Sequence, residues 1–88
     1  MPRDTLTIIN QRGLHARAAA KFVKLAGTFG AEISISKDGT QVSGLSIMGL
    51  MMLAAAPGDA IDISVEGVDA DAALAALSEL VRGGFGEE

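Results

Sequence analysis

The stretch TLTIINQRGLHARAAAKFVKLA, residues 5–26, changes its hydrophobic spacing once, and this change decides the fold. Before Gly13, Leu6 and Ile8 alternate with threonines, which is the two-residue period of a half-buried strand. After Gly13 the apolar residues recur at the three- and four-residue steps of a helix, at Ala19, Phe22, Val23 and Ala26. The stretch therefore predicts a strand, a glycine break and a helix over about residues 16–26.

Three further strands are expected from the same alternation. Ile33 and Ile35 alternate with polar residues, and the apolar residues over 61–65 do the same. Asp38-Gly39 predicts a hairpin turn, because both central residues of such a turn favour positive φ. The returning strand is expected over residues 40–43.

Two further helices complete the pattern. The apolar stretch over residues 46–54 is too long and too broken by glycine for a strand, so it predicts a helix of two turns. Asp69 is expected to cap a last helix, and the tail over residues 83–88 is expected to fray. The order β-α-β-β-α-β-α predicts an α+β fold in two layers, with helices on one face of a sheet and solvent on the other.

Length and composition exclude several classes of protein. The 88 residues are expected to form one domain, over 1–88. The chain has no cysteine and one histidine, which excludes a disulfide scaffold and a cysteine nucleophile and argues against a metal site. No bound cofactor is expected. Neither an apolar span nor a leader-like segment is found, so we expect a cytoplasmic protein without membrane insertion.

The charge of the chain is unevenly distributed. The net charge of −4 argues against nucleic acid as a partner. Four basic residues and no acidic residue fall within residues 5–31, whereas the rest of the chain holds three basic and eleven acidic residues. The basic residues of this segment are Arg12, Arg17, Lys21 and Lys24. Their clustering suggests a face that meets an anion, although chance clustering in a small protein is the alternative.

His15 lies at the junction between the first expected strand and the first expected helix, at or beside the N-cap of that helix. Free backbone N–H groups and the positive end of the helix dipole favour an anion there, and Arg17 adds a guanidinium two residues on. A neutral imidazole in this setting is a plausible phosphoryl acceptor; the alternative is a surface cap without chemistry. The nearest acid upstream, Asp4, lies a whole strand away, and no Ser-His-Asp hydrolase arrangement is apparent.

Two segments resemble one known family. GLHARAAAKF, residues 13–22, resembles the active-site signature of HPr, the histidine-containing phosphocarrier of the phosphoenolpyruvate-dependent phosphotransferase system. SGLSIMGLMML, residues 43–53, is similar to the regulatory-serine helix of that family. The resemblance covers essentially the whole chain, and it implies an open-faced β-sandwich of a four-stranded antiparallel sheet under three helices.

The resemblance also implies a function. Enzyme I would phosphorylate His15 on Nδ1, Arg17 would steady the phosphoryl group, and a histidine of a IIA-type acceptor would receive it. Ser46 would be the site of an HPr kinase/phosphorylase. Ala18 stands where the family usually has proline, which leaves the chemistry intact but makes the preferred partner an open point. The alternative is a regulatory, nitrogen-type binding module, whose phosphorylation state controls partners rather than sugar uptake.

The apolar helix after Ser46 has two interpretations. Serine before an apolar helical run is a preferred N-cap, whether or not it is modified. We expect Leu50 and Leu53 to point inward and Ile47, Met48 and Met51 to form a partly exposed docking surface, although a fully buried or dimerising helix is the alternative. The residues expected to dock partners are Ile47, Met48, Met51, Ala16, Ala20 and Lys24. The chain is expected to act as a monomer that forms transient complexes.

Overall fold

A computed structural model describes residues 2–87 and contains, within them, four strands and three helices in the expected order. The elements are β1 (Arg3–Thr7), α1 (Ala16–Ala26), β2 (Ala31–Lys37), β3 (Thr40–Ser43), α2 (Ile47–Met52), β4 (Ala60–Gly67), α3 (Ala70–Arg82) and a 3-10 turn, η1 (Gly84–Gly86). The α+β fold class is confirmed.

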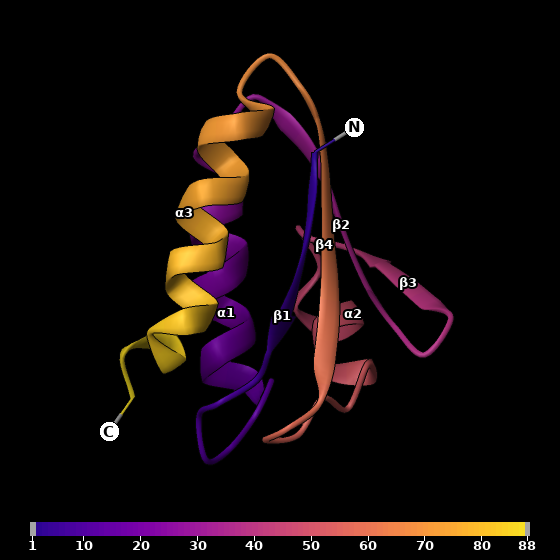
Figure 1. The fold of residues 1–88 in the computed structure, drawn as a ribbon, viewed down its shortest axis with the longest axis vertical. Helices are drawn as coiled ribbons and strands as arrows, with labels where there is room; N and C mark the ends of the chain where they lie inside the picture. Colours follow the sequence, from indigo (N-terminus) through magenta and orange to yellow (C-terminus); the bar gives the residue numbers. More distant parts are fainter. Residues whose placement is uncertain (1, 88) are drawn as a thin grey trace.

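All four strands belong to one antiparallel sheet with the order β1-β4-β2-β3. Helices α1 and α3 pack side by side along one face of it, and α2 packs against α1 and the β3 end (Figure 1). Ile61, Ile63 and Val65 of β4 are buried under the helices, because alternate residues of a strand face the same side. The residues between them face solvent, as expected for an open-faced sheet.

The core consists mainly of aliphatic side chains and alanines, with Phe22 and Phe85 fully buried. On α1 the prediction for Val23 was wrong in part: Val23 is half-buried, and Ala18 is buried instead. The reason is that α1 lies between α2 and α3 as well as on the sheet, which widens its buried arc toward the side of Ala18. No helix within residues 2–87 is long and apolar enough to cross a membrane.

Asp69 does not cap α3 with its side chain, contrary to the prediction. Its Oδ2 accepts a hydrogen bond from the backbone N–H of Gly30 at 2.8 Å instead. The carboxylate thus ties the turn before α3 to the turn before β2. Asp71 lies in the first turn of α3, where a negative charge favours the helix dipole.

The expected fraying of the tail is also wrong over the residues that the structure describes. Gly84–Gly86 form η1, and the Phe85 side chain is only 1% exposed. The Lys21 Nζ donates a hydrogen bond to the Phe85 carbonyl oxygen at 2.7 Å. The tail therefore folds back over the first turns of α1, because the apolar area that Phe85 buries offsets the entropy lost by ordering the end of the chain.

Candidate functional site

The loop between β1 and α1 is shaped by Gly13. Its φ is +63°, and a side chain there would overlap the carbonyl oxygen of Ala55. That carbonyl accepts a hydrogen bond from the backbone N–H of Leu14 at 3.0 Å, and the Gly13 N–H bonds to the Asn10 carbonyl at 3.1 Å. Only glycine combines this conformation with so close an approach. The loop is thus held in place, and it delivers His15 to the start of α1.

His15 is the N-cap residue of α1, as the sequence predicts. Its backbone is extended, with φ −75° and ψ 177°, and its carbonyl accepts the first helical hydrogen bond, from Ala19, at 2.9 Å. Its side chain makes no capping hydrogen bond, so within residues 2–87 the N–H groups of the first turn of α1 stay open. The first turn also carries no acidic residue. This end of the helix is therefore suited to stabilise an anion beside the imidazole.

An acidic residue that the sequence did not predict contacts the imidazole. Glu87 Oε2 bonds to His15 Nε2, and Glu87 Oε1 accepts from Asn10 Nδ2 at 3.1 Å. The same Asn10 nitrogen donates to the Gly13 carbonyl at 2.8 Å. Hydrogen bonds from Asn10 and then from His15, together with the positive charge of Lys21, lower the pKa of Glu87 below its ordinary value. No hydrogen bond to His15 Nδ1 forms within residues 2–87.

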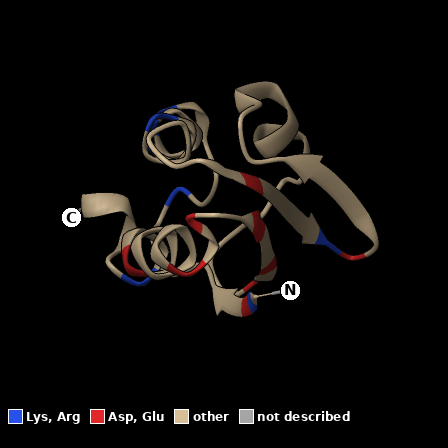
Figure 2. Cartoon of the chain, turned by 90° about the horizontal axis from the view of Figure 1, so that it is seen from above, with Lys and Arg blue, Asp and Glu red and all other residues tan. Residues whose placement is uncertain are grey.

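The basic residues of the segment gather around this contact. A hollow of about 420 Å³ is lined by Gln11, Arg12, Arg17, Lys21, Gly86 and Glu87. In Figure 2 the basic residues of α1 lie together without an acidic neighbour on that helix, whereas acidic residues mark β4 and α3. Among the described residues, Arg12, Arg17 and Lys24 take part in no salt bridge. Their charges are therefore free to meet an anion.

Ser46 and the apolar residues around it lie on the neighbouring helix. The Ser46 Oγ accepts a hydrogen bond from the Gly49 N–H at 2.9 Å, which confirms the predicted N-cap. Leu50 and Leu53 are buried, as predicted. The exposed apolar patch consists of Leu45, Ile47, Met48, Met51 and Met52. Sequence reasoning missed Leu45, which precedes α2, and Met52. Met52 is exposed because a six-residue helix that packs on the rest of the protein with one side leaves most of its circumference in solvent.

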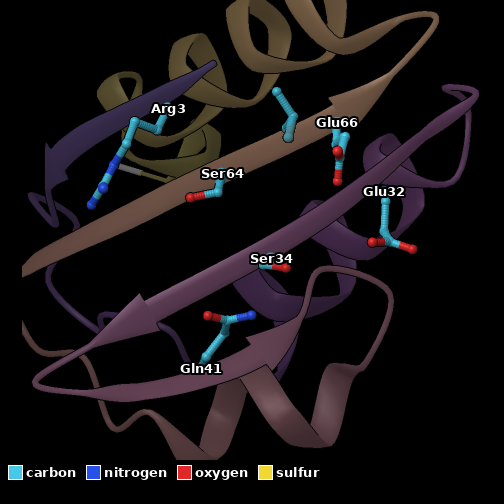
Figure 3. Close-up of a pocket in the computed structure, with 7 residues that line it drawn as sticks. Arg3, Glu32, Ser34, Gln41, Ser64 and Glu66 are labelled. Atoms are coloured by element: carbon cyan, nitrogen blue, oxygen red, sulfur yellow. The ribbon is translucent and has the colours of Figure 1, made fainter. Parts of the chain in front are cut away.

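A hollow of about 500 Å³ lies elsewhere, on the solvent face of the sheet (Figure 3). Its walls are mostly polar side chains of neighbouring strands, among them Glu32 and Glu66, which are register partners on β2 and β4. It holds none of the residues that the sequence singles out. Its size alone therefore does not make it the functional site, and the smaller basic hollow beside His15 is the better candidate.

Comparisons with known proteins show the family of the chain. The family model described as "PTS HPr component phosphorylation site" matches residues 2–83. The phosphocarrier protein HPr of Neisseria meningitidis serogroup A is 47% identical over 87 residues, covering 99% of this chain and 98% of that protein. A crystal structure of HPr-C-His from Thermoanaerobacter tengcongensis has a TM-score of 0.95 at 43% identity and covers 100% and 99% of the two chains.

A second crystal structure from Thermoanaerobacter tengcongensis, described as an HPr dimer, has a TM-score of 0.79 at 42% identity over 99% of this chain and 100% of that one. The family model and the relatives extend over nearly the full chain, so the resemblance is not confined to one motif. The chain therefore belongs to the HPr family, the phosphocarrier proteins of the phosphotransferase system.

Proposed function

We propose that this chain carries a phosphoryl group on Nδ1 of His15, receiving it from enzyme I and passing it to a histidine of a IIA-type acceptor. The observation that carries the proposal is the asymmetry of the imidazole. Nε2 is bonded to Glu87, whereas Nδ1 has no hydrogen-bond partner within residues 2–87. The ring stands at the open N-terminus of α1, with its side chain 21% exposed.

The chemistry is a pair of phosphoryl transfers. In the first, the Nδ1 lone pair forms a bond to phosphorus while the bond from phosphorus to the donor atom of enzyme I breaks, and that atom keeps the electron pair. In the second, a ring nitrogen of the acceptor histidine forms a bond to phosphorus while the bond from phosphorus to Nδ1 breaks, and His15 recovers its lone pair. Nε2 keeps its proton throughout. The chain is consumed and regenerated as a carrier, and it does not itself turn over a metabolite.

Positive groups around His15 stabilise the transferred phosphoryl group. The open N–H groups of the first turn of α1 are fixed donors, and they need no reorganisation when the anion arrives. Arg17 lies in that turn, exposed and without a salt bridge to a described residue. A guanidinium binds two phosphate oxygens in parallel, which suits a group that must be held and then released.

Partners are proposed to dock on the apolar patch and the exposed alanines of α1. Met48 is 71% exposed, and Ala16 and Ala20 face solvent on α1, which packs against α2. Methionine side chains adapt to several partners, and Lys24 with Arg17 adds a charged rim that steers an acidic surface. Complexes of this kind are weak, so a monomer that binds in turn to enzyme I and a IIA-type acceptor fits the surface. A dimer through the patch is the alternative.

Ser46 is proposed as the regulatory phosphorylation site of an HPr kinase/phosphorylase. A phosphate there adds about −1.5 to −2 charges at the start of α2, beside the apolar patch. The added charge repels a partner that approaches through acidic residues. Ser46-phosphorylated protein should therefore accept phosphate from enzyme I more slowly than the unmodified protein, and equal rates would contradict this regulatory role.

The experiment that tests the proposal is incubation with enzyme I and labelled phosphoenolpyruvate. The chain should gain a label that is labile in acid and stable in base, as expected of a phosphohistidine. His15→Ala should abolish the label, and Ser46→Ala, a matched change at the other candidate site, should keep it. A label that survives in His15→Ala would refute the proposal. A transfer assay with IIA-type proteins of the sugar and nitrogen branches then decides between sugar uptake and the regulatory alternative.

A further inference from the structure

The tail after α3 follows a path that glycine makes possible. Gly84, Phe85 and Gly86 all have positive φ, at 62°, 58° and 72°. Three consecutive left-handed residues reverse the chain sharply at the end of α3. Phe85 holds this conformation although it is not glycine, because its ring is fully buried and Lys21 holds its carbonyl oxygen. The reversal therefore places the next residue, Glu87, in a fixed position.

The Glu87 carboxylate is bonded on both oxygens. Asn10 donates to Oε1, and His15 Nε2 contacts Oε2. Asn10 is itself fixed, since the residue is only 5% exposed and its side chain also donates a hydrogen bond to the Gly13 carbonyl. The carboxylate thus lies between two nitrogens that come from the loop before α1. Its own side chain is only 15% exposed, so solvent competes weakly for these bonds.

We infer that Glu87 is a positioning residue for His15: its carboxylate holds the proton of the neutral imidazole on Nε2 and leaves the Nδ1 lone pair free. This inference rests on the proposed function for its purpose, which is to select Nδ1 as the phosphoryl acceptor. An ionised carboxylate accepts and never donates, so only a ring nitrogen that carries a proton can bond to it. In the tautomer with the proton on Nδ1, the lone pair of Nε2 would face the lone pairs of the carboxylate oxygen, and the two would repel each other.

The surrounding charges keep Glu87 ionised for this role. Arg12, Arg17 and Lys21 line the same hollow as Glu87, and among residues 2–87 no other acidic side chain lines it. The hydrogen bonds from Asn10 and His15 and the charge of Lys21 lower the pKa of Glu87, so that it is a carboxylate at neutral pH. When the phosphoryl group leaves, the same carboxylate still holds the ring in its orientation.

The isosteric variant Glu87→Gln tests the inference. A glutamine has one acceptor oxygen for two converging donors, so its amide must turn an NH₂ group toward either Asn10 or His15. The matched control is Glu32→Gln, the same chemical change on the solvent face of the sheet. The readout is the ratio of the two imidazole tautomers, from two-bond ¹H–¹⁵N spectra of labelled protein at about pH 9, above the ordinary pKa of histidine.

We expect Glu87→Gln to lower the ratio of the Nε2-protonated to the Nδ1-protonated tautomer about tenfold, since a hydrogen bond to a charged group is lost. Glu87→Ala should also lower the ratio, and Glu32→Gln should leave it unchanged. A ratio within about twofold of the wild type in both Glu87 variants would overturn the inference. The ratio is measured on unphosphorylated protein, so it decides the positioning role even if enzyme I fails to phosphorylate the chain, a result that would refute the proposed function alone.

Discussion

Replacing Gly13 with alanine tests whether the loop before α1 is what places His15. Gly13 has a φ of +63°, and an added Cβ would overlap the backbone carbonyl oxygen of Ala55 and lie 3.1 Å from the Ala56 Cα. The obstacle is backbone, which cannot turn aside as a flexible side chain can. To accept the methyl group, the loop must move away from Ala55, and the hydrogen bond from Leu14 to that carbonyl must lengthen or break.

The cost of Gly13→Ala can be worked from these contacts. A left-handed conformation costs a residue with a Cβ about 1–2 kcal/mol. Forcing an extra methyl group into a packed position costs about 1–3 kcal/mol, and the weakened hydrogen bond costs about 1 kcal/mol. The loss of stability should therefore be about 3–6 kcal/mol, a large part of the roughly 5–15 kcal/mol that a small domain has. In thermal unfolding this corresponds to a Tm lower by at least about 12 °C.

Gly39→Ala is the matched control in the same protein. Gly39 also has a positive φ, +85°, but nothing lies within 4 Å of an added Cβ. That variant should lose only the conformational cost of about 1–2 kcal/mol. The assay is thermal and urea unfolding of both variants followed by circular dichroism. If Gly13→Ala were no less stable than Gly39→Ala, the contact with Ala55 would not hold the loop, and this account of how His15 is placed would be refuted.

Three further predictions concern the helix α2 and the tail. Ser46→Ala should lower the free energy of unfolding by about 1 kcal/mol in urea titrations, because the bond that caps α2 through the Gly49 N–H is lost. Met48→Asp should slow phosphoryl transfer from enzyme I while the Tm stays close to that of the wild type; an equal loss of both would show that Met48 is part of the core. Because Asn10 and His15 lower the pKa of Glu87 below 4.5, the carboxylate stabilises the fold above about pH 4.5, and this stabilisation is lost as the pH falls through the lowered pKa. The stability difference between the wild type and Glu87→Gln should therefore vanish on acidification, and a difference that persists in acid would contradict the assignment of the contact to an ionised Glu87.

The fold could be predicted from the sequence because its signals are local and repeated. Alternating isoleucines fixed the faces of β2 and β4, and the Asp38-Gly39 pair placed the hairpin between β2 and β3. The spacing of apolar residues does not predict which side chains are buried where a helix packs on more than one neighbour. Val23, expected in the core, is half-buried, and Ala18, for which the spacing made no prediction, is buried. The reason is that the contacts of α1 with α2 and α3 are set by the tertiary structure and not by the helix itself.

Part of the candidate site could be predicted in the same way, because its residues lie close together in the sequence. His15, Arg17 and the open first turn of α1 belong to one short segment, and Ser46 caps its helix three residues from its partner Gly49. The rest of the site joins distant parts of the chain. Glu87 meets His15 across 72 residues, and Asn10 meets Glu87 across 77. No periodicity or motif reports such pairs, and a glutamate after glycines at the end of a chain has the local character of an unstructured tail.

One feature of the composition could have corrected the prediction for the tail. The chain has three phenylalanines and neither tryptophan nor tyrosine, so each aromatic ring is a large share of what its small core can bury. Leaving Phe85 in solvent would forfeit about 1.5–3 kcal/mol of hydrophobic stabilisation. Docking it needs a reversal after α3, and the glycines on either side of Phe85 supply the left-handed conformations for that reversal. Once the ring is buried, the residue two positions later has little freedom, and the carboxylate beside His15 follows from the packing of an aromatic side chain rather than from any signal of its own.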